Sequence, residues 1–244
     1  MNTIAIVTPR RRLTGKLIGA EDGRRPGLLF VHGWGASQRQ DMGKAKRLAR
    51  DGFACLTFNL TGHARTRRHV ETVTRADNLR DVLAAYDFLA GQPTVDPERI
   101  GIVGSSYGGY LATLVTAERK VRWLALHAPA LYKDLDFARP KRELNLDPDL
   151  PAFRRRPVTP SENMALERAA RFRGDVLVVE AEHDQVIPRQ VILNYLTAFH
   201  AGAASVTHEV LRGADHGLSA RHWRSAYAAA LVRWLAGHAA DRAQ

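Results

Sequence analysis

The stretch "GIVGSSYGGY" at residues 101–110 holds two adjacent serines between glycines. It fits the pattern G-x-S-x-G with Ser106 in the middle. Glycines two places on either side permit a sharp, strained turn from a strand into a helix, which lifts the serine hydroxyl above the sheet. The apolar run "RIGIV" precedes this turn and the helix-compatible "GYLATLVTA" follows it. We therefore predict that Ser106 is a nucleophile and that Ser105 is structural; the alternative is a glycine-rich turn with an idle serine.

Short apolar runs alternate with amphipathic segments on both sides of this turn. Six runs are predicted strands, at residues 27–33, 53–59, 99–105, 121–127, 175–181 and 205–211. Five of them are nearly continuously apolar, as buried parallel strands are, and residues 3–8 and 11–18 are expected to form an antiparallel edge. Helices are predicted at 74–91, at 159–172 behind the capping box "TPSE", and near the C-terminus. The alternation predicts an α/β fold, a mostly parallel central sheet with helices on both faces.

Length and composition fit one globular unit. A chain of 244 residues with 45% hydrophobic content can fill one sizeable core, so we expect a single domain over residues 1–244. The start "MNTIAIVTPRRR" has its arginines after the apolar residues, the wrong order for a secretory signal, and no apolar run is long enough to span a membrane. One cysteine, Cys55, excludes an internal disulfide. A cytoplasmic protein is predicted.

The net charge of +11 is large enough to raise nucleic acid as a partner. The basic clusters lie at Arg10–Arg12, Arg24–Arg25, Arg65–Arg68 and Arg154–Arg156. These clusters are scattered through predicted loops, and no recognition-helix or RNA-binding aromatic pattern accompanies them. A solvated surface is the favoured interpretation, and no nucleic-acid partner is expected.

Residues 132–158 stand apart from the alternating pattern. They contain four prolines, charges of both signs and little periodicity, and they follow a strand at the predicted upper edge of the sheet. This segment is predicted to be a short flap inserted over a pocket. His127 and Tyr132, just past that strand, could line the pocket or pack in the core.

A serine hydroxyl needs a base to take its proton and an acid to hold that base in one tautomer. In this type of fold the three residues come in the order serine, acid, histidine, each on a loop at the carboxyl end of a strand. "EAEHDQVIP" offers Asp184 and "GADHG" offers His216, both downstream of Ser106. Glu182 is the rival acid, and Asp184 could alternatively cap the helix after Pro188.

Acyl transfer also needs hydrogen-bond donors for the oxyanion that develops on the carbonyl oxygen. One donor is the backbone N–H of the residue after the nucleophile, here Tyr107. The loop "VHGWGAS" after the first central strand is expected to supply the second, the N–H of Trp34, because Gly33 and Gly35 let the backbone turn toward the serine. Trp34 and Tyr107 are thus the predicted oxyanion hole.

Together "HGWG", "GSSYGG", "DQVIP" and "ADHG" resemble the α/β-hydrolase superfamily over about residues 25–237. Within it the chain is similar to small esterases of the dienelactone hydrolase and prolyl-oligopeptidase-like group. The resemblance implies a triad of Ser106, Asp184 and His216, with Trp34 and Tyr107 as oxyanion donors.

The chain departs from the pattern of these families in three respects. Dienelactone hydrolases carry cysteine where this chain has Ser106. Relatives often have an "RGxG" turn where this chain has "NLTGHARTRR". A chain of 244 residues is also too short for the propeller of prolyl oligopeptidases.

Other chemistries lack their sequence patterns. "GWGASQ" has two glycines but not the third of a dinucleotide-binding loop, no Lys-Ser/Thr pair follows the glycines as in a phosphate-binding loop, and no H-E-x-x-H is present. No cofactor and no metal are expected.

The predicted function is a serine hydrolase that cleaves small-molecule carboxylic esters through an acyl-enzyme. A small peptidase or aminoacyl hydrolase, and a non-enzymatic binding protein on the same fold, remain alternatives.

Overall fold

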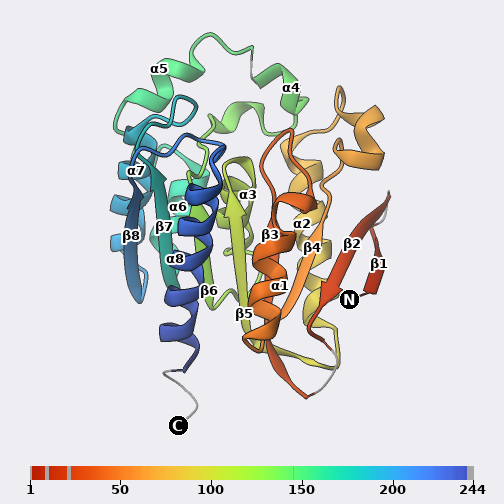
Figure 1. The fold of residues 1–244 in the computed structure, drawn as a ribbon. Helices are drawn as coiled ribbons and strands as arrows, with labels where there is room; N and C mark the ends of the chain where they lie inside the picture. The colour runs from red at the N-terminus through yellow and green to blue at the C-terminus, as the bar shows by residue number, and fades with distance from the viewer. Residues whose placement is uncertain (1, 9–10, 21–22, 145, 241–244) are drawn as a thin grey trace.

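The protein is described by a computed structural model that covers residues 2–8, 11–20, 23–144 and 146–240. Arg10 of the first basic cluster and Asn145 of the predicted flap lie outside these ranges. Eight strands form one sheet in the order β1-β2-β4-β3-β5-β6-β7-β8 (Figure 1). The strands are β1 Asn2–Val7, β2 Arg12–Ile18, β3 Arg25–Val31, β4 Ala54–Phe58, β5 Val95–Ser105, β6 Trp123–His127, β7 Asp175–Ala181 and β8 Ser205–Leu211.

Helices cover both faces of this sheet, as predicted. The α-helices are α1 Met42–Arg50, α2 Arg75–Ala90, α3 Tyr107–Val115, α4 Lys141–Leu144, α5 Leu150–Arg155, α6 Met164–Arg171, α7 Arg189–His200 and α8 Arg221–Ala240. α1 and α8 lie side by side on one face, and α2, α3, α6 and α7 lie on the other (Figure 1). No helix in these ranges is both long enough and apolar enough to cross a membrane.

Strand direction brings the functional loops to one edge. β1 pairs with β2, and β2 with β4, in antiparallel fashion, so the predicted antiparallel edge is confirmed. From β4 to β8 every pairing is parallel. The carboxyl ends of β5, β6, β7 and β8 therefore meet at the same edge of the sheet. Ligands of open α/β sheets bind outside these ends.

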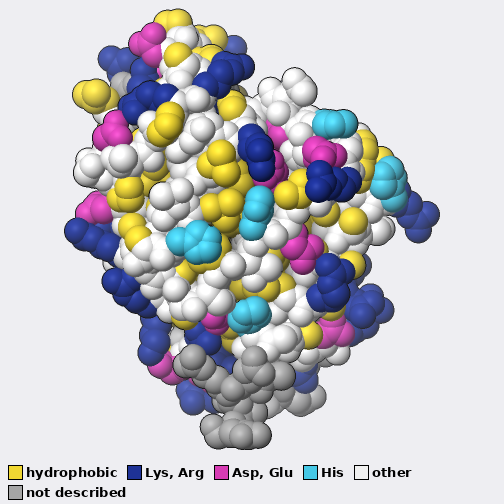
Figure 2. Space-filling model, turned by 90° about the vertical axis from the view of Figure 1, so that its left-hand side faces the viewer, with side chains coloured by type: hydrophobic (Ala, Val, Ile, Leu, Met, Phe, Trp, Pro, Cys, Tyr) yellow, Lys and Arg dark blue, Asp and Glu magenta, His cyan; other side chains and the backbone are white. Residues whose placement is uncertain are grey.

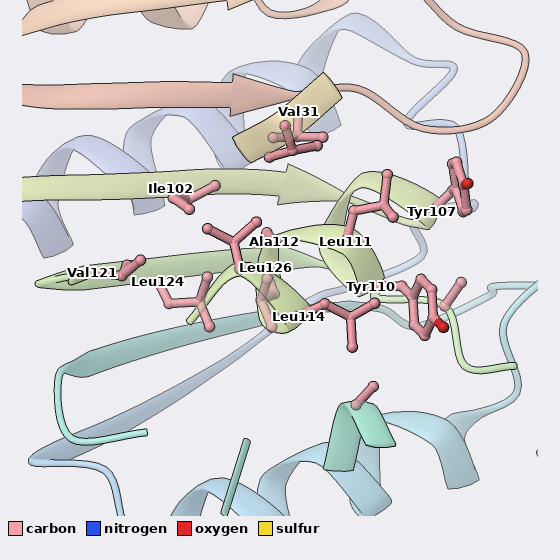
Figure 3. Close-up of a cluster of buried hydrophobic side chains, with 14 of the residues drawn as sticks. Val31, Ile102, Tyr107, Tyr110, Leu111, Ala112, Leu114, Val121, Leu124 and Leu126 are labelled. Atoms are coloured by element: carbon pink, nitrogen blue, oxygen red, sulfur yellow. The ribbon is translucent and has the colours of Figure 1, made fainter. Parts of the chain in front are cut away.

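Two apolar layers hold the helices onto the sheet. On the face of α3, Leu111 and Leu114 pack toward Leu124 and Leu126 of β6 (Figure 3). On the opposite face, four residues of α8 are buried: Tyr227, Leu231, Trp234 and Leu235. The strands between the layers are apolar on both faces because both faces are covered. This rigid two-sided packing fixes the turn at Ser106.

One predicted helix boundary is wrong. Thr159 and Glu162 form the bonds of a capping box, since the Thr159 N–H and hydroxyl donate to the Glu162 carboxylate at 2.9 and 2.8 Å. These bonds close a turn, however, and α6 begins only at Met164. Asn163 caps that helix by accepting hydrogen bonds from the N–H groups of Ala165 and Leu166. An asparagine at the N-cap competes well with threonine, and it shifts the helix start by several residues.

The predicted flap contains short helices and arches over the carboxyl edge of the sheet (Figure 1). It is anchored to the start of α2, where the Lys141 N–H donates to the Val73 carbonyl at 2.7 Å and Thr74 pairs with Pro140. The Arg154 side chain adds a hydrogen bond to the Leu131 carbonyl at 2.9 Å. The segment is therefore packed against the body of the fold rather than detached from it.

Basic side chains do not gather into one patch on the face that Figure 2 displays; Lys and Arg are distributed over it with Asp and Glu between them. Several exposed arginines pair with acids, such as Arg119 with Asp87 at 2.6 Å and Arg233 with Glu209 at 3.3 Å. Exposed pairs of this kind contribute little to stability, about 0–1 kcal/mol each. The arrangement fits the solvated surface expected from the sequence.

A stability prediction follows from the close packing around the serine turn. A Cβ built on Gly108 would overlap the carbonyl oxygen of Val31 and lie 2.6 Å from that of His32. Gly108→Ala is therefore expected to lower the free energy of unfolding by about 2–3 kcal/mol in urea titrations. Gly43→Ala is the control, because a Cβ there meets nothing within 4 Å, and helix propensity favours alanine by about 1 kcal/mol. Equal urea concentrations at the unfolding midpoint for Gly108→Ala and the wild type would contradict this packing.

Candidate active site

Ser106 occupies a strained turn between β5 and α3. Its φ of 51° and ψ of −115° lie in a region that non-glycine residues rarely adopt, at a cost of about 1–3 kcal/mol. Backbone hydrogen bonds hold the turn: the Ser106 N–H donates to the His127 carbonyl at 2.8 Å, and the Ala130 N–H donates to the Ser106 carbonyl at 3.0 Å. A Cβ at Gly104 would lie 2.6 Å from the Gly108 carbonyl oxygen, so both glycines of the motif are sterically required. The turn thus presents the Ser106 hydroxyl at the carboxyl edge.

Three predicted residues meet at this edge. His216 Nε2 lies 3.1 Å from Ser106 Oγ, and His216 Nδ1 lies 2.7 Å from Asp184 Oδ2. Ser106, Asp184 and His216 follow β5, β7 and β8, which is the serine, acid, histidine order expected from the sequence. Both ring nitrogens are within hydrogen-bond distance of a partner, so the imidazole can pass a proton on one side while it is oriented from the other.

Asp184 is held in place by its own loop. Its Oδ1 accepts hydrogen bonds from the N–H groups of Val186 and Ile187 at 2.8 and 2.7 Å, which leaves Oδ2 for His216. Glu182, the rival acid, instead accepts from the Gly213 N–H at 2.7 Å and pairs with Arg212 at 2.5 Å. The rival carboxylate therefore bonds elsewhere, and Asp184 is the acid in contact with the imidazole.

The two predicted oxyanion donors flank the serine. Tyr107 is the first residue of α3, and the N–H groups of a first helical turn have no partner within the helix. The loop after β3 passes close by, since a Cβ on Gly33 would lie 3.5 Å from the Ser106 Cβ. The rings of Trp34 and Tyr107 lie 5.6 Å apart, edge to face. The loop that carries Trp34 therefore lies beside Ser106, and the two amides remain the predicted oxyanion donors.

Two histidines tie the Trp34 loop to the loop after β4, and sequence reasoning missed this role. The Gly35 N–H donates to His63 Nε2 at 3.0 Å, while the Leu60 N–H donates to His32 Nε2 at 3.1 Å. The other ring nitrogens face carbonyls, His63 Nδ1 that of Thr61 and His32 Nδ1 that of Gly33. The signal was present in "VHGWG" and "TGHA", where each histidine stands beside a glycine just at or after the end of a predicted strand.

Loss of this brace is expected to slow turnover. His63→Leu removes the acceptor for the Gly35 N–H, so the Trp34 amide is positioned less tightly, and kcat should fall about tenfold to a hundredfold with little change in KM. Steady-state kinetics on an ester substrate measure both parameters. His69→Leu, at the end of the adjacent 3-10 helix Ala64–His69, is the matched control. An unchanged kcat in a folded His63→Leu protein would contradict the brace.

Buried histidines should make stability depend on pH. Burial, reinforced by nearby His32, lowers the pKa of His63 from an ordinary 6.5 to about 4. Burial, reinforced by His216, lowers the pKa of His127 to about 3. The unfolded chain takes up these protons near pH 6.5 and the folded chain does not, so stability falls as pH drops from about 6.5 toward 4. In urea titrations, each histidine should add about 1.4 kcal/mol per pH unit to the change of the free energy of unfolding with pH. His127→Phe should remove one such contribution. The same pH dependence in His127→Phe and the wild type would contradict this prediction.

The flap contributes a buried lysine beside the site. Lys141 is 1% exposed, and its Nζ lies 4.7 Å from the Trp34 ring centre, 4.9 Å from that of Tyr132 and 5.2 Å from that of Tyr107. Burial, together with the charges of Arg154 and Arg75, lowers the pKa of Lys141 to about 7. Cation–π contact with three rings offsets part of the desolvation of this ammonium. Tyr132 therefore packs under the flap, one of the two roles considered for it.

Several solved structures share this architecture. A ferulic acid complex of Est1E from Butyrivibrio proteoclasticus aligns with 98% of this chain and 100% of its own at a TM-score of 0.74 and 16% identity. A dienelactone hydrolase from Anabaena variabilis aligns over 97% and 96% at 0.68 and 18% identity. The acylaminoacyl peptidase of Pyrococcus horikoshii aligns over 96% of this chain and 41% of its own, at 0.72 and 18% identity. The chain thus has the α/β-hydrolase fold, as predicted.

The family can be stated more closely. A family model described as the prolyl oligopeptidase family matches residues 40–242, and the chain belongs to this family. Among curated proteins, an uncharacterized protein of Pseudomonas aeruginosa is 30% identical over 102 residues, and dipeptidyl-peptidase 5 of Porphyromonas gingivalis is 46% identical over 50 residues. The aligned parts span only 28% and 6% of those two proteins. The predicted resemblance to this group of hydrolases is confirmed.

Proposed function

We propose that this protein is a serine hydrolase that cleaves carboxylic esters of small molecules through an acyl-enzyme intermediate. The observation that carries the proposal is the chain of contacts from Asp184 through His216 to Ser106, at 2.7 and 3.1 Å. Membership in a hydrolase family supports it.

In the proposed acylation step, Ser106 Oγ attacks the ester carbonyl carbon while its proton moves to His216 Nε2. Asp184 accepts a hydrogen bond from His216 Nδ1–H and stabilises the imidazolium that forms. The N–H groups of Trp34 and Tyr107 donate to the carbonyl oxygen as it becomes negative. The carbon–oxygen bond to the alcohol then breaks, and His216 returns its proton to the leaving oxygen.

Deacylation repeats these steps with water as the nucleophile. His216 takes a proton from the water, the hydroxide oxygen attacks the acyl carbon, and the tetrahedral intermediate is again stabilised by the two amides. Collapse releases the carboxylic acid, and the proton on His216 returns to Ser106 Oγ. No cofactor or metal takes part in the proposed cycle.

Ester cleavage is supported by the alignment of Est1E and the dienelactone hydrolase over nearly their whole lengths. Peptide or aminoacyl-amide cleavage is the second candidate, favoured by the prolyl oligopeptidase family model. Turnover of p-nitrophenyl esters of two to eight acyl carbons, compared with aminoacyl p-nitroanilides, separates the two. Higher kcat/KM for the esters supports the proposal, while higher kcat/KM for the anilides selects the second candidate. Absence of both activities in folded protein would favour a binding role.

Two further predictions from the sequence are kept as part of this proposal. Residues 1–244 are proposed to form a single domain, and the reaction is proposed to take place in the cytoplasm. Limited proteolysis tests the first, since one protected fragment of nearly full length is expected. Fractionation of the source cells tests the second.

A further inference from the structure

A cavity lies between α1 and α8, the two helices that stand side by side on one face of the sheet (Figure 1). Its volume is about 310 Å³, within the range of small-molecule sites. Leu218, Tyr227 and Ala228 give it an apolar lining. Ser106, Asp184 and His216 are not among the described residues that line it. The cavity is therefore separate from the candidate active site, although Gly217 and Leu218 of its wall directly follow His216.

A buried imidazole in this cavity lacks a hydrogen-bond partner. His127, the last residue of β6, is 3% exposed and lines the cavity, and its Nε2 has no partner among the described residues. The ring is held by contacts at 5.0 Å to the Tyr227 ring and 6.4 Å to the His216 ring. The buried Tyr227 hydroxyl, also in the lining, has no partner among the described residues either. Buried polar atoms are normally satisfied, and unsatisfied ones point to a water or a ligand. A ligand in the cavity can supply that partner, since a neutral imidazole both donates and accepts.

The charges around the cavity are unbalanced. Its lining includes Lys44, Arg221 and Arg224, and no Asp or Glu among the residues described. Asp41 pairs with Lys44 at 2.9 Å, and Arg224 donates to the Leu218 carbonyl at 2.9 Å. Asp41 offsets the charge of Lys44, and the charges of Arg221 and Arg224 are not matched by any acid in the described lining, which favours an anion there.

We propose that this cavity binds a small organic monoanion, a carboxylate with a short apolar chain. The carboxylate lies between the cationic rim formed by Lys44 and Arg221 and the Nε2–H of His127, which donates to it, and the chain lies against Tyr227 and Leu218. This inference stands apart from the proposed hydrolysis, because it uses none of the residues of that mechanism. The chain of the bound ligand contacts Leu218, which belongs to the loop that carries His216, so the site is placed to influence the active site.

Isothermal titration calorimetry with hexanoate tests the proposal, with hexylammonium as the cationic probe of equal chain length. Gly43→Leu fills the cavity, since Gly43 lines it and a Cβ there meets nothing within 4 Å. Its matched control is Gly237→Leu in α8, where a Cβ also meets nothing within 4 Å. Arg221→Gln removes a rim charge, and Arg233→Gln removes a charge from the same helix outside the lining.

Hexanoate is expected to bind the wild type and both controls equally. Binding should be at least about tenfold weaker in Gly43→Leu and about three- to tenfold weaker in Arg221→Gln. Hexylammonium should not bind. The proposal is overturned if the wild type gives no hexanoate binding at millimolar concentrations, if Gly43→Leu binds hexanoate like the wild type, or if hexylammonium binds equally well.

Discussion

Ser106→Ala is expected to lower kcat for ester hydrolysis by about a millionfold, to the level left by substrate binding and the oxyanion donors. The reason is the direct contact of Ser106 Oγ with His216 Nε2 at 3.1 Å, which makes the serine hydroxyl the group positioned to attack. His216→Ala should cost a similar factor, because the serine is not activated without a base. The double variant should be no slower than either single variant, since the residues act as one unit. Stopped assays with a p-nitrophenyl ester measure all three.

Ser105→Ala is the matched control for this series. Ser105 is the neighbouring serine, 5% exposed at the end of β5, and it was predicted to be structural. Its replacement should change kcat less than about tenfold. If Ser106→Ala retained more than about a hundredth of the wild-type kcat, while Ser105→Ala lost more, the nucleophile would be misassigned.

Asp184→Asn is expected to lower kcat about ten thousandfold. An amide at this position can donate a hydrogen bond to His216 Nδ1, which favours the tautomer with its proton on Nε2, and that nitrogen can then no longer accept the proton of Ser106. The backbone N–H groups of Val186 and Ile187 still anchor the side chain oxygen, so the fold should be kept. Ester kinetics and a thermal melt on the same sample separate the two effects.

The control for this prediction uses the competing acid. Glu182→Gln alters a carboxylate that bonds Gly213 and Arg212 and does not contact His216 in the described structure. Its kcat should stay within about tenfold of the wild type. Comparable losses in Glu182→Gln and Asp184→Asn would mean that loop integrity, and not the contact with the imidazole, controls activity.

The sequence predicted the fold well because its signals are local and strong. Buried parallel strands appear as apolar runs, and each of the six predicted runs contains or overlaps an observed strand. The capping box at Thr74 and Asp77 starts α2, and the predicted helix over 74–91 is confirmed. The three residues of the predicted triad could be chosen because a parallel sheet places the ends of its strands at one edge, whatever their separation in sequence.

Other features depended on contacts that a linear pattern does not encode. The choice between Asp184 and Glu182 was decided by which carboxylate the backbone turn directs at His216. The brace through His32 and His63 joins residues 28 positions apart in both of its hydrogen bonds to backbone N–H groups. The start of α6 depended on competition between two adjacent caps, in which Asn163 prevailed. Aperiodic sequence over 132–158 gave no means to predict the short helices α4 and α5 or the burial of Lys141.

The most direct test of the central claim, that Ser106 is activated by His216, is covalent labelling with a fluorophosphonate followed by mass spectrometry of the digested protein. The account predicts one adduct, on the peptide that carries Ser106, formed at a much lower rate in His216→Ala and absent in Ser106→Ala. Equal labelling of wild type and Ser106→Ala, or an adduct on a different residue, would contradict it.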